Sequence, residues 1–72
     1  MPRKIQLLDI VALTVDRPDK RLVQGQVGTV VEALGGGVYE VEFSDEEGRT
    51  YAQLPLDEGQ LLVLHYEPQE AA

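Results

Sequence analysis

A glycine-punctuated stretch from Gly25 to Phe43 constrains the fold of this chain more than any other feature. It begins with a glycine turn, continues through the β-branched run Thr29-Val30-Val31, and reverses at three consecutive glycines. β-Branched residues favour a pleated, half-buried surface, and glycine adopts backbone conformations that a Cβ atom resists. Residues 38–43 then alternate with the period of two that a half-buried strand requires. The stretch predicts a β-hairpin within an all-β fold.

Three further strands are predicted around this hairpin. A turn-forming loop with Pro18 ends the first strand, and Pro55 is expected to end the fourth because proline lacks the ladder N–H. One helical turn at residues 57–59 precedes the fifth strand. Leu22 and Val23 are expected to fold the first long loop back onto the core. The five predicted strands span residues 9–15, 26–34, 38–43, 50–54 and 60–64.

This order of elements predicts a small five-stranded SH3-like barrel. The alternative is a Greek-key barrel of the oligonucleotide-binding type, which usually needs a longer connection than the loop at residues 44–49. The barrel is expected to span residues 9–64, between a lead-in at residues 1–8 and a frayed tail at residues 65–72. The predicted core comprises Leu13, Val30, Val41, Phe43, Leu54, Leu61 and Val63.

Three glycines are assigned structural turns. Gly25 is expected to form a tight turn, Gly28 a bulge or a close backbone approach, and Gly48 a positive φ in a hairpin loop. The runs at 25–28 and 35–37 do not predict a phosphate-binding loop. Neither opens a helix, and neither is followed by Lys-Ser or Lys-Thr.

The charge is strongly uneven along the 72 residues, whose net charge is −7. The first 31 residues carry a net charge of +2, and the remainder carries −9. An acidic balance opposes the phosphate neutralisation that drives nucleic-acid binding, and it suits solubility or docking on a basic partner. The basic loop from Arg17 to Arg21 is the feature that favours nucleic acid.

Glu32, Glu40 and Glu42 are the candidate partner-binding residues. On adjacent antiparallel strands they are expected to line one face of the sheet. Like charges opposed across strands cost stability, so such a face is either simply solvated or held ready for a cationic partner. Both interpretations remain open at this point.

Catalytic and metal chemistry find no support in the residue pattern. His65 is the only histidine and has no carboxylate placed beside it, and the run Asp45-Glu46-Glu47 lacks the ligand spacing of a calcium loop. The hydroxyl residues have no neighbouring base. The chain is therefore predicted not to be an enzyme and to hold no metal or other cofactor.

The compartment predicted from the sequence is the cytoplasm. The chain has no cysteine, which excludes disulfides and fits a reducing environment. Its longest apolar run, Leu61 to Leu64, is far too short to span a membrane, and Asp9 interrupts the segment that would follow a signal-like start. No membrane association is expected. A domain this small is only marginally stable, which leaves homo-oligomerisation open.

Several segments resemble the small bacterial family catalogued as domain of unknown function 4926. The resemblance covers about residues 7–64, implies an SH3-like barrel, and carries over no catalytic residue. The glycine turn is also similar to the SH3-like C-terminal domain of the nitrile hydratase β subunit and, more distantly, to the KOW element of ribosomal and elongation proteins. The segments that carry the family resemblance are Asp9–Thr14, Gly25–Val31, Tyr39–Phe43 and Gln60-Leu61.

The predicted function is a non-catalytic protein–protein interaction module, either an inhibitor, antitoxin-like protein or an accessory partner. The family resemblance suggests a partner encoded nearby, such as a toxin or a metabolic enzyme. KOW-like binding of nucleic acid or the ribosome is one alternative, although the chain lacks the basic strand-edge residues of that pattern. An accessory subunit of a metalloenzyme is the other, and it follows only from the nitrile hydratase likeness.

Overall fold

Five strands and two short helical turns make up the computed structural model, which describes residues 5–69. The all-β prediction is confirmed, because each helical turn within these residues spans only three residues. The outer parts of the predicted lead-in and tail, residues 1–4 and 70–72, lie outside the described residues. The elements in chain order are β1 (Ile10–Leu13), η1 (Pro18–Lys20), β2 (Val27–Gly35), β3 (Val38–Ser44), β4 (Thr50–Asp57), η2 (Glu58–Gln60) and β5 (Leu61–Val63).

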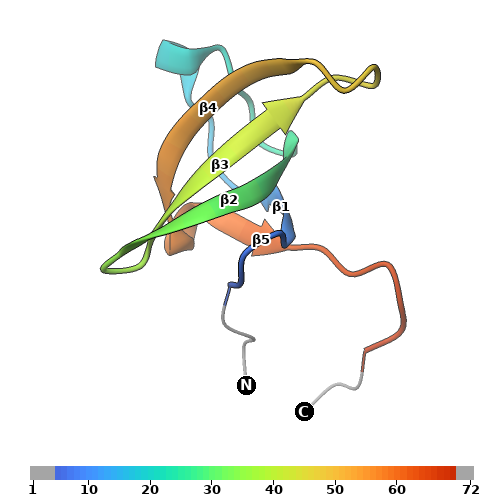
Figure 1. The fold of residues 1–72 in the computed structure, drawn as a ribbon. Helices are drawn as coiled ribbons and strands as arrows, with labels where there is room; N and C mark the ends of the chain where they lie inside the picture. Colours follow the sequence, from blue (N-terminus) through green and yellow to red (C-terminus); the bar gives the residue numbers. More distant parts are fainter. Residues whose placement is uncertain (1–4, 70–72) are drawn as a thin grey trace.

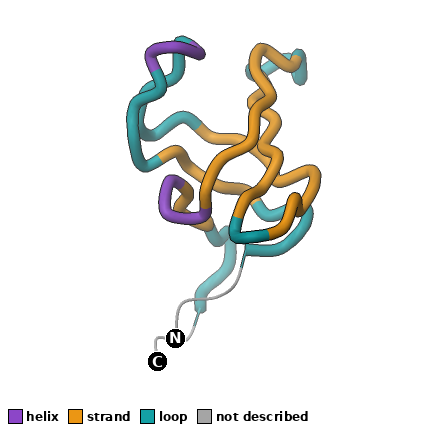
Figure 2. Tube along the Cα trace, turned by 90° about the vertical axis from the view of Figure 1, so that its left-hand side faces the viewer, coloured by secondary structure: helices purple, strands orange, loops and turns teal. Residues whose placement is uncertain are grey.

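All five strands belong to one antiparallel sheet in the order β4-β3-β2-β1-β5. Figure 1 shows β2, β3 and β4 side by side, with the β2–β3 and β3–β4 hairpins pointing to opposite ends of the molecule. The helical turns lie at the periphery of the strands in Figure 2. β4 and β5 stand at the two ends of the strand order, so closure into a barrel stays a prediction.

Glycines with positive φ make the predicted turns. The β2–β3 hairpin closes through Gly36 and Gly37, whose φ values of 64° and 80° suit a tight two-residue hairpin loop. Gly25 has a φ of 97°, and its N–H donates to the carbonyl of Leu13 at 2.7 Å. Gly48 has a φ of 82° in the β3–β4 loop. The predictions for Gly25 and Gly48 are confirmed.

One hydrophobic cluster fills the inner side of the sheet, and it confirms the predicted core with one exception. Val63 is only partly buried and packs against the cluster. Leu22 is buried as expected. The prediction that Val23 also packs onto the core was wrong, because its side chain is 59% exposed. The loop turns its single buried side chain inward at Leu22. The cluster comprises Val11, Leu13, Leu22, Val30, Tyr39, Val41, Phe43, Leu54, Leu56 and Leu61.

Pro55 does not end the fourth strand, and that prediction was wrong. β4 continues to Asp57, and Pro55 lies opposite Glu40 within it. β4 is at the end of the strand order, where a proline nitrogen can face away from the ladder without removing a hydrogen bond. The extension brings Leu56 into the core at 1% exposure.

Gly28 marks a close approach between strands. It pairs in unbroken register with Val11 on one side and Phe43 on the other, so the bulge offered as one explanation is wrong there. The close approach is confirmed. A Cβ at this position would lie 2.8 Å from Cγ1 of Val41 and 2.9 Å from the carbonyl oxygen of Glu42.

The last strand is preceded by a capped helical turn, η2, one residue later than predicted. The Asp57 side chain accepts the N–H of Gly59 at 3.2 Å, and the Gln60 side chain accepts the N–H of Asp57 at 3.1 Å. This reciprocal arrangement satisfies the donors at the start of the turn. It fixes the direction in which the chain leaves β4 and enters β5.

Candidate functional site

Three glutamates share the outer face of the sheet, as the sequence predicts. Glu32 on β2 lies directly opposite Glu40 on β3. Glu42 lies two residues further along β3 and therefore points to the same side, because side chains alternate along a strand. The other side of β3 carries the buried residues Tyr39, Val41 and Phe43. We call Glu32, Glu40 and Glu42 the acidic face.

A β-bulge brings Glu32 onto this face. Val30 pairs with Val41, yet Glu32 pairs with Glu40, so two residues of β2 span one residue of β3. Strict alternation from the fully buried Val30 would turn Glu32 into the core. The additional residue, Val31, resets the alternation. A charged residue two positions after a core valine was the signal in the sequence for this bulge.

The surroundings of the acidic face are polar and contain little that neutralises it. Gln53 on β4 donates from Nε2 to Oε2 of Glu40 at 3.2 Å. Glu42 lies between Thr29 and Gln53 in the register. Glu40 and Glu42 are half-buried, and Glu32 is exposed. Within residues 5–69, the ion pairs of Arg17 and Arg49 go to acids outside the acidic face.

Arg17 and Arg49 illustrate where the positive charge is used. Arg17 donates from Nε and Nη2 to the carboxylate of Asp19, with both distances 3.1 Å. This hydrogen bond, with a smaller contribution from charge attraction, raises the pKa of Arg17 and lowers the pKa of Asp19. Arg49 donates to Asp45 and Glu47 in the β3–β4 loop. The hydrogen bonds and ion pairs of both arginine side chains therefore go to residues outside the acidic face.

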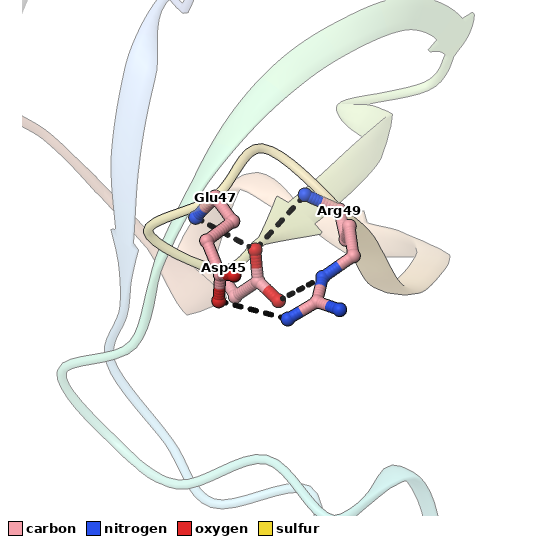
Figure 3. Close-up of polar contacts among 3 residues, drawn as sticks. All are labelled: Asp45, Glu47 and Arg49. Carbon is pink, nitrogen blue, oxygen red and sulfur yellow. Dashed lines mark hydrogen bonds and ion pairs between the residues drawn. The ribbon is translucent and has the colours of Figure 1, made fainter.

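The β3–β4 loop is organised by the side chain of Asp45 (Figure 3). Oδ1 of Asp45 accepts the backbone N–H groups of Glu47 and Arg49, both at 2.9 Å. The Arg49 side chain then bridges Asp45 at 3.1 Å and Glu47 at 2.8 Å. Two carboxylates of the Asp45-Glu46-Glu47 run are therefore held by one guanidinium and by backbone donors.

We expect the pKa of Asp45 to lie below its ordinary value. The backbone N–H of Arg49 is the main cause, followed by the N–H of Glu47 and the Arg49 side chain. Because the pKa is lowered on folding, the stabilisation is present at neutral pH and is lost as the pH falls through the pKa of the folded state. A pH titration of the side-chain carboxyl carbons by NMR measures the pKa of Asp45 directly.

The variant Arg49→Gln is the control for that titration. It removes the guanidinium and keeps the backbone N–H that contributes most, so the Asp45 pKa should rise only part of the way towards its ordinary value. A complete return would show that the arginine side chain, not the turn, holds the carboxylate.

Other candidate ligands lie apart. His65 is exposed and follows β5 without regular structure. Within residues 5–69, no group of three histidine, cysteine, aspartate or glutamate side chains is placed to hold a metal ion. No helix in the same part of the chain has both the length and the apolar character needed to cross a membrane.

Most of the chain matches a known protein family. The model of the family described as Domain of unknown function (DUF4926) matches residues 7–63. The chain belongs to this family. The match runs from the turn before β1 to the end of β5, so all five strands of this DUF4926 domain lie within it. No curated protein and no solved structure gave a significant match to the chain.

Proposed function

We propose that the protein is a non-catalytic module that binds another protein through its acidic face. The observation that carries the proposal is the direct opposition of Glu32 and Glu40 across β2 and β3. Like charges placed opposite each other destabilise a sheet, and no described cation relieves them. A basic surface on a partner would turn this unfavourable arrangement into a favourable one.

The overall charge supports a protein partner over a nucleic acid. The net charge of −7 works against phosphate binding, which depends on neutralisation by lysine and arginine. Lys20 at the end of η1 and Arg21 directly after it are exposed, but Arg17 in the same loop is already paired with Asp19. The described part of the chain thus offers only a small cationic surface. We propose a cytoplasmic protein as the partner.

We expect the triple variant Glu32→Gln, Glu40→Gln, Glu42→Gln to associate more slowly with the partner and to lose salt dependence. Rim charges act mainly on the association rate, so the dissociation rate should change less. The partner is first captured from a lysate of cells that express the protein, identified by mass spectrometry and purified. Surface plasmon resonance over a range of salt concentrations then gives both rates for each variant.

The matched control is Glu46→Gln, Glu58→Gln, Glu67→Gln, which removes the same number of charges from exposed positions outside the acidic face. Equal slowing by both triple variants would contradict docking at the acidic face. The free energy of unfolding of the acidic-face variant should equal that of the wild type or exceed it by up to about 1 kcal/mol, because repulsion between the glutamates is relieved. Submicromolar binding of duplex DNA or structured RNA at about 150 mM salt, lost on replacing Arg17, Lys20 and Arg21, would favour the KOW-like alternative instead.

A further inference from the structure

An apolar band crosses three strands on the same outer side of the sheet as the acidic face. Ala12 in β1 pairs with Val27 in β2 on one side and with Leu62 in β5 on the other. These side chains point away from the core, because their neighbours Val11 and Leu61 are buried and an added Cβ on Gly28 would meet the core side chains of Val41 and Phe43. Val27 is 46% exposed and Leu62 is 57% exposed.

The band extends one row towards the glutamates. Leu64 follows β5 and donates its N–H to the carbonyl of Ile10 at 2.8 Å, which places the two residues side by side. Ile10 pairs with Thr29, and Thr29 pairs with Glu42 of the acidic face. One row therefore runs from an apolar end to an acidic end. We define the apolar band as Ile10, Ala12, Val27, Leu62 and Leu64.

Val27 and Leu62 are exposed, and Ile10, Ala12 and Leu64 are half-buried beside them. Contiguous apolar residues that reach the surface of a small domain mark a docking surface more often than isolated ones do. The charge of the neighbouring acidic face indicates which kind of molecule would cover the apolar band. A second copy of this chain would bring another −7 against the acidic face beside the band, so self-association through this surface is opposed. An anionic membrane is opposed for the same reason. A cationic segment with apolar side chains is favoured by both parts of the surface.

We infer that the outer face binds an amphipathic basic segment of a partner protein, with apolar side chains on the band and lysine or arginine on Glu32, Glu40 and Glu42. The inference rests on the proposed function and specifies the partner's chemistry. Charge complementarity alone would require only that the partner present a basic surface. The band adds the requirement that apolar residues be interspersed among the basic ones.

Synthetic peptides separate these requirements. Fluorescence anisotropy compares a peptide of alternating lysine and leucine with one of alternating lysine and serine, which has the same charge. The lysine–leucine peptide should bind about tenfold tighter, since additional apolar surface is buried. In ¹⁵N NMR spectra, that peptide should shift the amides of Ala12, Val27 and Leu62 as well as those of the glutamates. Equal affinity of the two peptides would overturn the inference and leave the proposed function standing.

Two matched double variants complete the test. Val27→Ser with Leu62→Ser should remove most of the preference for leucine. Leu34→Ser with Val23→Ser should keep it, because these residues have nearly the same exposure, 46% and 59%, but lie in the β2–β3 hairpin end and the η1–β2 loop. Equal loss in both variants would also overturn the inference. A dimer seen by sedimentation velocity that dissociates in the Val27→Ser, Leu62→Ser variant would overturn it too, because the occupant would then be a second copy of this chain.

Discussion

Replacing Phe43 with alanine should lower the free energy of unfolding by about 3–5 kcal/mol. Phe43 is fully buried at the centre of the cluster, where β3 pairs with β2 on one side and β4 on the other. Its ring lies beside the Cα of Gly28 and 6.4 Å, between centroids, from the ring of Tyr51. Alanine would leave a cavity that both neighbouring strands border. A domain of 72 residues has little stability in reserve, so much of the population should unfold.

Urea titration followed by circular dichroism measures this loss, with Tyr66→Ala as the control. Tyr66 is 87% exposed and lies beyond β5, so its replacement should change the free energy of unfolding by less than about 0.5 kcal/mol. If the Phe43→Ala variant unfolds at nearly the wild-type urea concentration, the Phe43 ring does not contribute substantially to the stability of the core.

Gly28→Val should also destabilise the fold, because it overfills the space between strands instead of leaving a cavity. The first added carbon would already lie 2.8 Å from Cγ1 of Val41, 2.9 Å from the carbonyl oxygen of Glu42 and 3.0 Å from Cδ2 of Phe43. The carbonyl belongs to the paired backbone of β3 and cannot rotate away as a side chain would. Overpacking of this kind costs about 1–3 kcal/mol and sometimes more, and valine adds two methyl groups beyond that carbon.

Gly25→Ala separates crowding from backbone strain. Gly25 has a φ of 97° but nothing within 4 Å of an added Cβ, so alanine there should cost about 1–2 kcal/mol through conformation alone. Gly28→Val should exceed it in thermal and urea unfolding. If the two variants unfold alike, or if Gly28→Val retains wild-type stability, the close approach between β2 and β3 is not a constraint on this fold.

Local patterns predicted most of the strands, because alternation and glycine turns act within a few residues. Residues 38–43 alternate without interruption and form β3 as expected. Pro55 was misjudged because its tolerance depends on β4 being an edge strand, which is a property of the whole sheet. Two core residues were not predicted. Val11 lies on β1, where apolar residues on both faces hide which side is buried. Leu56 lies beyond the proline that was expected to end the strand.

The acidic face was predictable only in part. The three glutamates were placed on adjacent strands correctly, but strict alternation would have sent Glu32 inward. The bulge at Val31 resolves this conflict, and no glycine marks it. The apolar band was not predicted, because it joins β1, β2 and β5, whose pairing depends on contacts between residues far apart in the chain.

The proline in β4 has a consequence for how copies of this chain meet at high concentration. A strand that approached the free side of β4 would need N–H donors from alternate residues. Pro55 has none, and the N–H of Asp57 is already donated to the Gln60 side chain. Two successive positions on this edge therefore cannot template a new strand. The β4 edge is thereby protected against growing into an extended β-aggregate, and contacts made along it are left to side chains rather than to backbone ladders.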